Sequence, residues 1–521
     1  MLIMGGAVFA DEVCELALLN GRVIDPESDT DIVRNIGIKA GKIFYLGTEA
    51  VETKKTIDIA GLVVSPGFID FLSYDQNGTG EYYKAADGVT TNLSMHGASM
   101  VNFEKYFENT KNKLYLNQGG AISQIRLRYS VGLMDAYQKP STVQIQSMCE
   151  LAEKAYANGA LGLNLSTEYL PGTTFEEELE LAKVTKKWNA LMTGHIRYST
   201  MFDKKTNIDA IREVIELVRQ TGVSFQIDHI NSTGGTFSMA ASLDLIKKAN
   251  EEGLDITLDM YPYDSWATYL ASARFDGDWQ KRFQITYKDL QIANQPERLT
   301  EEKFKTIKKM KAPYNNPLTV AYAVPEKDIV TALLFPGMII GSDTIIEPDK
   351  NNHPRGAGCY ARLFQKYVKE TKLLTLTQAI AMCSYYPARR LEGVSSAMKN
   401  KGRIKEGADA DLVIFDPEKI KEKATVESPG EYSEGIEMVL VNGRIVKDNA
   451  GIVKGIFPGK PVKRDSSYFT LKKSPATLPA EVKKVKRIEI TPVDKGLLSG
   501  EKQITSEKTA PLPASPITGE K

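Results

Sequence analysis

Histidine is scarce in this chain, and its positions suggest a shared chemical task. The 521 residues contain four histidines, and three of them end short apolar runs typical of strands: NLSMH ends at His96, ALMTGH at His195 and SFQIDH at His229. Three neutral imidazoles can hold Zn²⁺ and leave a position for water. The alternative for each residue is an isolated histidine with its own hydrogen-bond partner. Equivalent positions on three strands favour one shared metal site.

An aspartate follows a fourth run of the same kind. Asp343 ends the segment GMIIGSD. A carboxylate next to a zinc-activated water can accept its proton and later return it to a leaving amine. We therefore expect Asp343 to be the catalytic residue and to lie among the metal-binding groups. The alternative is a capping role in the loop SDTIIEPD.

Groups that could bind an anionic substrate lie nearby in the sequence. Arg355 follows Asp343 by twelve residues, and a guanidinium can clamp a carboxylate through two parallel hydrogen bonds. Tyr261 and Tyr263 flank a proline in DMYPY, and a tyrosine hydroxyl can bind a carboxylate or an oxyanion. The alternatives are a surface arginine and simple aromatic packing. The remaining histidine, His353, is expected to be structural.

A (β/α)₈ TIM-type barrel, an α/β fold, would bring these residues together. From residue 66 to 394, apolar runs of strand length alternate with amphipathic stretches of helical period. This alternation predicts a parallel sheet, and active sites of the barrel lie at the carboxyl ends of its strands. An open doubly wound sheet is the alternative, but no G-x-G-x-x-G follows the first strand. Residues 265–325 are polar, aromatic and helix-leaning, and we expect an insertion that covers the barrel mouth.

Antiparallel β signals stand on both sides of the barrel region. They occupy residues 11–65 and 395–461, and both segments contain an N-G-R triplet within a similar pattern, LLNGRVID and VLVNGRIVKD. Two-residue turn signals occur at Asn20-Gly21, Ala40-Gly41 and Asn442-Gly443. We expect both ends of the chain to build one small β-sandwich domain.

The two termini differ in composition from the rest. Residues 1–10, MLIMGGAVFA, resemble the end of a signal peptide but lack a basic segment, so both a cytoplasmic and an exported protein are open. Residues 462–521 are rich in Lys, Pro, Ser and Thr, which predicts a flexible tail.

The bulk composition narrows the class of partner. Lys+Arg and Asp+Glu both number 66, so net charge gives no argument for nucleic acid. No stretch is long and apolar enough for a transmembrane helix. The four cysteines are scattered and predict neither a disulfide framework nor a cysteine-based zinc site. A small-molecule substrate is the expected partner.

Several motifs together resemble one enzyme family over about residues 16–450. They are SPGFID (65–70), GVTT (88–91), GALGLN (159–164), YLPG (169–172), GHIR (194–197), DMYPY (259–263), GSD and HPR within 341–355, and PARRLEG with KGRIKEGADADLVIFDP (387–417). In these segments the chain resembles the D-aminoacylase branch of the amidohydrolase superfamily, the N-acyl-D-amino-acid deacylases. The resemblance implies zinc-dependent hydrolysis of a linear amide, the acyl bond of an N-acyl-D-amino acid, at a Zn²⁺ centre.

The resemblance also implies roles for single residues. His195 and His229 match zinc-binding histidines, and Asp343 matches the catalytic aspartate. Residues at the substrate, by the same comparison, are Arg355, Tyr261 and Tyr169. His96 takes the place of a cysteine ligand if one residue is deleted in the comparison. Without that deletion, Gly97 stands there and the ligand is lost.

Other positions depart from the family pattern. Leu72 and Tyr74 stand where the family has a His-x-His metal-binding pair. Asn231 replaces a lysine and Ala267 a serine, with Thr268 adjacent. We therefore expect a single metal ion and a changed substrate specificity. Manganese, iron or nickel could occupy a three-histidine site in place of zinc.

Two other functions are open. The loss of the His-x-His pair is also what a catalytically inactive binding protein of this fold would show. A cyclic amidase of the dihydroorotase or hydantoinase type is the other alternative. Those enzymes resemble the chain in architecture but need a carboxylated lysine after the fourth strand, where ALGLNLSTEYLPG has none.

Overall fold

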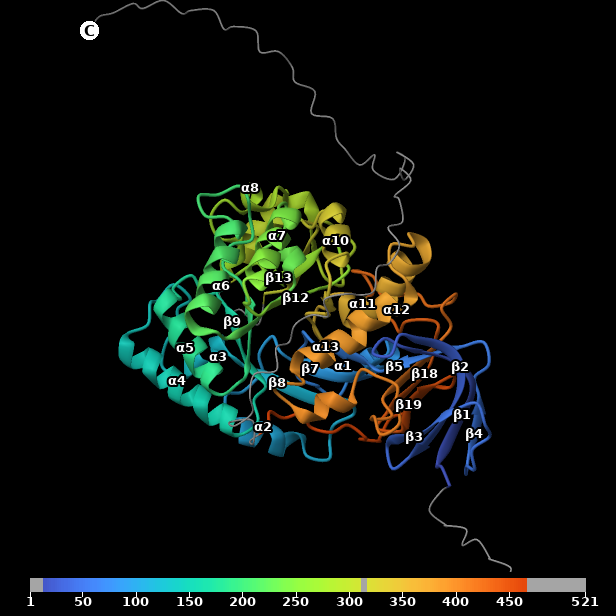
Figure 1. Cartoon of the computed structure of the whole chain (residues 1–521). Coiled ribbons are helices and arrows are strands. Elements are labelled where there is room, and N and C mark those ends of the chain that lie inside the picture. The colour runs from blue at the N-terminus through green and yellow to red at the C-terminus, as the bar shows by residue number, and fades with distance from the viewer. Residues whose placement is uncertain (1–12, 311–315, 466–521) are drawn as a thin grey trace, which may run out of the picture. The chain divides into compact units, whose positions relative to one another are not determined.

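An eight-stranded parallel sheet forms the centre of the molecule (Figure 1). The computed structural model describes residues 13–310 and 316–465. Neighbouring strands pair in chain order. The strands are β6 (Phe68–Asp70), β7 (Val89–Ser94), β8 (Asn117–Ser123), β9 (Gly162–Ser166), β10 (Leu191–His195), β11 (Ser224–Ile227), β12 (Ile256–Met260) and β16 (Ile339–Ile340). The predicted barrel-type fold is confirmed.

Contacts beyond the first and last strands bring the two edges of this sheet together. The backbone N–H of Asp343 donates to the Leu72 carbonyl at 2.7 Å, and that of Ser342 donates to the Asp70 carboxylate at 2.9 Å. The residues that follow β16 are therefore held next to those that follow β6. Side chains from the carboxyl ends of all eight strands can face one region.

Helices follow the strands along the chain. These segments are helical because their apolar residues recur with helical period. In α6 (Asn207–Thr221), for example, one face buries Ile211, Val214 and Val218, and the helix ends at Gly222 with φ of 66°. The other helices of this region are α1 (Gly80–Ala86), α2 (Phe103–Thr110), α3 (Gln124–Ser130), α4 (Thr142–Ala157), α5 (Phe175–Lys187), α7 (Met239–Glu251), α10 (Glu326–Leu333), α11 (Arg355–Arg362), α12 (Leu376–Ile380) and α13 (Tyr386–Leu391).

Both flanking β segments contribute to one nine-stranded sheet. Figure 1 shows β1 to β4 in blue beside β18 and β19 in orange-red. The join is made by β5, which pairs antiparallel with β17 and parallel with β1. The strands are β1 (Leu16–Asp25), β2 (Thr30–Lys39), β3 (Lys42–Gly47), β4 (Thr56–Asp58), β5 (Val63–Pro66), β17 (Leu412–Phe415), β18 (Ile436–Val441), β19 (Arg444–Asp448) and β20 (Gly451–Ile452).

One of the three predicted hairpins is wrong. Ala40 and Asn442 have positive φ, and each stands with its following glycine between paired antiparallel strands, as predicted. Asn20 also has positive φ, of 62°, but β1 runs straight through it and the pairing with β2 shifts there. The Asn-Gly pair forms a β-bulge, because the left-handed conformation that suits a tight turn also suits an extra residue in a strand.

The predicted insertion contains more β-structure than its sequence indicated. A separate three-stranded antiparallel sheet consists of β13 (Trp266–Tyr269), β14 (Leu290–Ile292) and β15 (Leu318–Ala321). Two helices, α8 (Trp279–Phe283) and α9 (Glu301–Lys308), accompany it. The helix-leaning prediction was therefore incomplete, since these strands are only three or four residues long.

The predicted tail begins a few residues too early. Val462 is fully buried, and Arg464 donates hydrogen bonds to the Tyr156 carbonyl at the end of α4. The remainder of the tail and the signal-like segment 1–10 lie outside the described residues. In the described part of the chain, no helix has the length and apolar character needed to cross a membrane.

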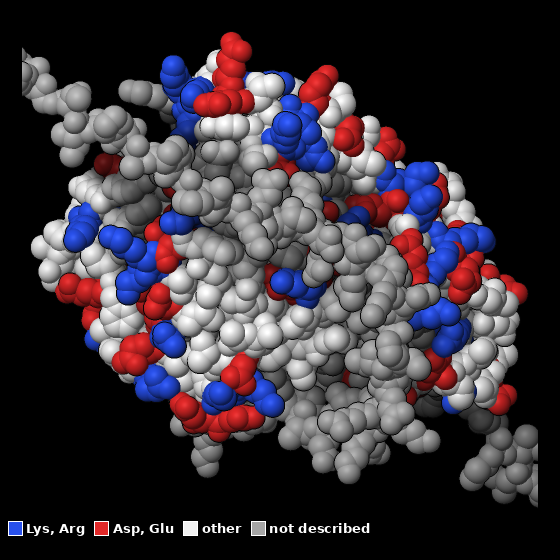
Figure 2. All heavy atoms as spheres, turned by 90° about the horizontal axis from the view of Figure 1, so that it is seen from above, with Lys and Arg blue, Asp and Glu red and all other residues white. Residues whose placement is uncertain are grey.

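Charged side chains of both signs mix on the surface. In the view of Figure 2, lysine and arginine alternate with aspartate and glutamate around the described residues of that face. This distribution agrees with equal numbers of acidic and basic residues. The described residues of this face form no single-sign patch of the kind that attracts nucleic acid.

Candidate metal centre

Three histidines converge at the carboxyl ends of barrel strands. His96 follows β7, His195 ends β10 and His229 follows β11. One nitrogen from each ring lies within 4.8 Å of the others. Nδ1 of His195 is 3.2 Å from Nε2 of His229, close to the separation of about 3.3 Å between two nitrogens on one tetrahedral zinc ion. Within residues 13–310 and 316–465, no other trio of histidine, cysteine or acidic side chains converges in this way.

Asp343 lies next to this cluster of three histidines. Its Oδ1 is 3.5 Å from Nε2 of His96, and its Oδ2 is 3.8 Å from Nε2 of His229. The carboxylate is largely buried. The four side chains that the strand-end pattern singled out thus meet in one place.

Backbone strain supports this geometry. His229 and Asp343 have φ of 31° and 51°, in the left-handed region that costs a residue with a side chain about 1–3 kcal/mol. The Asp259 carboxylate accepts a hydrogen bond from the His229 backbone N–H at 2.6 Å and holds the turn after β11. The surrounding structure therefore fixes both side chains toward the cluster.

Burial keeps the imidazoles ready to bind a cation. It lowers the pKa of His195 and of His229 well below their ordinary value, and the nearby Arg274 lowers both further. Both rings are therefore neutral near pH 7, which metal binding requires. Neutral nitrogens beside a carboxylate are a donor set that fits Zn²⁺ or a similar divalent ion.

The predicted substrate-binding residues surround the cluster. The Arg355 guanidinium donates to the Asp343 carboxylate at 2.8 Å and lies 4.3 Å from the centre of the Tyr261 ring. The Tyr169 ring is 4.6 Å from the ring of His195, and the Tyr261 ring is 6.0 Å from that of His229.

Residues that depart from the family pattern also have defined contacts in the structure. Leu72 is fully buried, and a Cβ added to Gly341 would lie 2.7 Å from its Cβ. The Tyr74 ring packs 5.3 Å from the His96 ring. His353 is buried behind Arg355 and accepts a hydrogen bond from its backbone N–H, in keeping with a structural role. Asn231 donates to the Tyr261 carbonyl.

Two charged residues at the site were not predicted from the sequence. The Glu168 carboxylate lies 2.6 Å from Nε2 of His195, and Arg274 of the insertion lies 3.6 Å from the same carboxylate. Glu168 could have been suspected, because it directly precedes Tyr169 in the motif region. Arg274 gave no signal, since its place depends on how the insertion folds.

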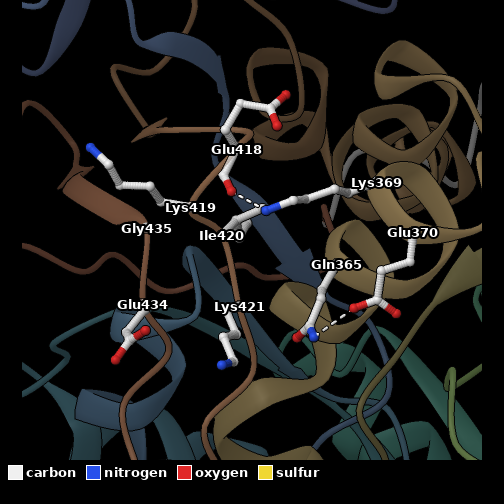
Figure 3. A pocket seen from close by; sticks show the side chains of 9 residues that line it. All are labelled: Gln365, Lys369, Glu370, Glu418, Lys419, Ile420, Lys421, Glu434 and Gly435. Atoms are coloured by element: carbon white, nitrogen blue, oxygen red, sulfur yellow. Dashed lines mark hydrogen bonds between the residues drawn. The ribbon is translucent and has the colours of Figure 1, made fainter.

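A hollow of about 560 Å³ lies elsewhere, between the π-helical turn Leu363–Glu370 and the loops at 418–421 and 434–435. Figure 3 shows Lys369 reaching the backbone carbonyl of Glu418 and Gln365 reaching Glu370. Lysines and glutamates line it in equal number, and none of the predicted site residues does. The histidine cluster is therefore the better candidate site.

Comparisons with known proteins agree with the metal-binding arrangement of the histidine cluster. The amidohydrolase family profile matches residues 337–447, which include Asp343 and Arg355. N-acyl-D-glutamate deacylase of Alcaligenes xylosoxydans xylosoxydans is 27% identical over 496 residues, covering 88% of this chain and 98% of that protein. D-aminoacylase of the same organism is 26% identical over 475 residues, covering 82% and 93%.

Over most of its length the chain is similar to the D-aminoacylase branch of the amidohydrolase superfamily. A solved structure has the same fold: N-acyl-D-glutamate deacylase of Bordetella bronchiseptica, complexed with zinc and a phosphonate inhibitor. It superposes with a TM-score of 0.75 at 24% identity, covering 87% of this chain and all of that one. Like these relatives, the protein is an amidohydrolase enzyme.

Proposed function

We propose that this amidohydrolase removes the acyl group from an N-acyl-D-amino acid. The observation that carries the proposal is the convergence of three imidazoles and one carboxylate at the barrel strand ends. Relatives that cover 88% and 82% of the chain are named N-acyl-D-glutamate deacylase and D-aminoacylase. The preference for the D-isomer rests on these relatives.

His96, His195 and His229 would hold one divalent ion, with zinc the first choice for this donor set. Such an ion, when bound, lowers the pKa of a water molecule to about 7 and polarises a carbonyl group. The chain's own contribution is to hold three imidazole rings in a fixed arrangement and to keep Asp343 beside them.

Asp343 is placed to move the proton. Its carboxylate lies against two of the three rings and can accept the proton of the attacking water. The same carboxyl group can then protonate the amide nitrogen as the bond to the acyl carbon breaks. The free amine and the carboxylic acid are the products.

Arg355 and Tyr261 offer a site for the substrate's α-carboxylate. Nη2 of Arg355 is paired with Asp343, but its Nε and Nη1 are buried with no hydrogen-bond partner of good geometry among the described residues. The same is true of the Tyr261 hydroxyl. Buried donors without a well-formed hydrogen bond are costly unless a ligand satisfies them. An anionic group would do so.

The test combines metal analysis with a substrate panel. Purified protein should carry about one zinc per chain and should hydrolyse at least one N-acetyl-D-amino acid faster than its L-isomer. The variant Asp343→Asn should keep its metal and lose about 10²–10⁴-fold in kcat. Full activity in metal-free protein would end the proposal. A protein with neither metal nor turnover would instead be the inactive binding protein that the loss of the His-x-His pair allows.

A further inference from the structure

The ring nitrogen of His195 that faces away from His229 has a carboxylate partner. Nδ1 of this ring faces His229 at 3.2 Å, whereas Nε2 lies 2.6 Å from Oε2 of Glu168. If Nδ1 offers its lone pair to a metal ion, the proton of the neutral ring must sit on Nε2. Nε2–H then donates to Glu168, so the contact selects the tautomer that metal binding needs.

His195 alone of the buried pair has this support. Nδ1 of His229 is buried and has no hydrogen-bond partner among the described residues. His229 is held through its backbone, by the Asp259 carboxylate. The ring orientation of His195 therefore depends on Glu168 in a way that the orientation of His229 does not.

Glu168 is in turn held from two sides. The Ser199 hydroxyl donates to the same Oε2 at 2.7 Å, and Nη1 of Arg274 lies 3.6 Å from it. A carboxylate fixed by a cation and a hydroxyl donor presents its oxygen to the His195 ring in one defined orientation.

Arg274 brings the insertion into this arrangement. Its guanidinium lies 4.0 Å from the Trp266 ring centre, within the aromatic core of the insertion. Its Nη2 donates to the Ser232 carbonyl, in the turn that follows His229. One arginine thus contacts the carboxylate that supports His195 and the turn that follows His229, and is itself fixed by an aromatic ring.

We propose that Glu168 is a positioning residue that fixes the tautomer and orientation of His195 for metal binding, and that Arg274 holds Glu168 in place. This inference rests on the proposed function, since it concerns the same metal site. Partners of this kind raise the basicity of a metal-binding histidine, and their loss costs about 10- to 100-fold in metal affinity.

The experiment measures zinc affinity by competition with a chromophoric chelator in the full-length protein. Glu168→Gln should bind zinc about 10- to 100-fold more weakly than wild type. Arg274→Met should shift affinity in the same direction by less. The visible absorption bands of the Co²⁺-loaded protein should also shift in Glu168→Gln, because the orientation of a ligand ring changes.

Glu177→Gln is the matched control. Glu177 is a buried glutamate paired with Arg128 and Gln124, and it contacts none of the three histidines. It should keep wild-type zinc affinity and the wild-type Co²⁺ spectrum. Should Glu168→Gln fail to fold, Ser199→Ala removes one hydrogen bond to Glu168 and should weaken zinc binding by about 3- to 10-fold.

The outcomes separate this inference from the proposed function. Wild-type protein that binds no metal refutes the proposed function itself. If wild type binds one ion but Glu168→Gln or Ser199→Ala matches it in affinity and Co²⁺ spectrum, Glu168 is no positioning residue and the proposed function stands. An equal loss in Glu177→Gln would assign the effect to general destabilisation and also overturn the inference.

Discussion

One oxygen of the Asp343 carboxylate lies 2.8 Å from Nη2 of Arg355. The proposed proton carrier and the proposed substrate clamp therefore form an ion pair with each other. Arg355 is 3% exposed, so this pair is shielded from water and from screening by salt. A substrate carboxylate must bind the remaining face of the guanidinium, and its binding is coupled to the position of Asp343.

Arg355→Met should show this coupling in the kinetics. Loss of a buried charge-assisted contact costs about 2–3 kcal/mol, or about 30- to 150-fold in kcat/KM. KM should rise because the carboxylate loses its partner, and kcat should fall because Asp343 loses its own. Steady-state kinetics on an N-acetyl-D-amino acid and on its carboxamide analogue would check this. An equal loss on both substrates would show that Arg355 does not bind the carboxylate.

We expect excess zinc to leave the enzyme active, because Leu72 and Tyr74 stand where the family has a metal-binding pair. Neither side chain supplies the imidazole that a second ion would need, and Leu72 is packed against Gly341. Zinc titration followed by elemental analysis should therefore saturate at about one ion per chain, with no fall in rate beyond that point. The double variant Leu72→His with Tyr74→His should approach two ions. Inhibition of wild type by a second equivalent would contradict the prediction.

His353 should make stability depend on pH. Burial lowers the pKa of His353 well below 6.5, and its Nδ1 accepts a hydrogen bond from the Arg355 backbone N–H, so the folded ring is neutral. The unfolded chain takes up a proton below about pH 6.5. The stability from this neutral ring is complete above that pH and falls by up to about 1.4 kcal/mol per pH unit below it.

The comparison with His353→Gln isolates this effect. Urea unfolding of wild type and variant should give a constant difference in free energy of unfolding at pH 7–8. Between pH 6 and pH 5 the difference should shrink by about 1.4 kcal/mol. Other buried titrating groups cancel in the comparison. A difference that stays constant down to pH 5 would mean that His353 is protonated in both states or in neither.

The strand-end residues of the site could be predicted because they depend on local pattern and on one rule of topology. Each of His96, His195, His229 and Asp343 follows an apolar run, and parallel strands bring their carboxyl ends together. Glu168 could not be assigned in this way, since its contact with His195 joins a turn to a strand end 27 residues later. Such contacts depend on side-chain packing, which leaves no periodic trace in the sequence.

Errors in the predicted fold have a similar origin. The Asn-Gly pair at 20–21 carries the same local signal as the pair at 442–443, yet one forms a bulge and the other a hairpin. The difference lies in the partners: β1 continues beyond the bulge and pairs there with β5, where a Cβ on Gly21 would lie 2.7 Å from a methyl carbon of Val64. Local propensity permits both outcomes, and tertiary pairing selects one.

Tyr261→Phe should separate substrate binding from stability. The Tyr261 hydroxyl is buried and has no hydrogen-bond partner of good geometry among the described residues, so removing it should leave the melting temperature unchanged or higher. If the hydroxyl binds the substrate carboxylate, KM should rise by about 5-fold, the worth of about 1 kcal/mol. Tyr263→Phe is the control, because that hydroxyl donates to Glu422 away from the cluster. It should lower the melting temperature and leave KM unchanged. If instead Tyr263→Phe raised KM and Tyr261→Phe lowered the melting temperature, the carboxylate site would lie at Tyr263.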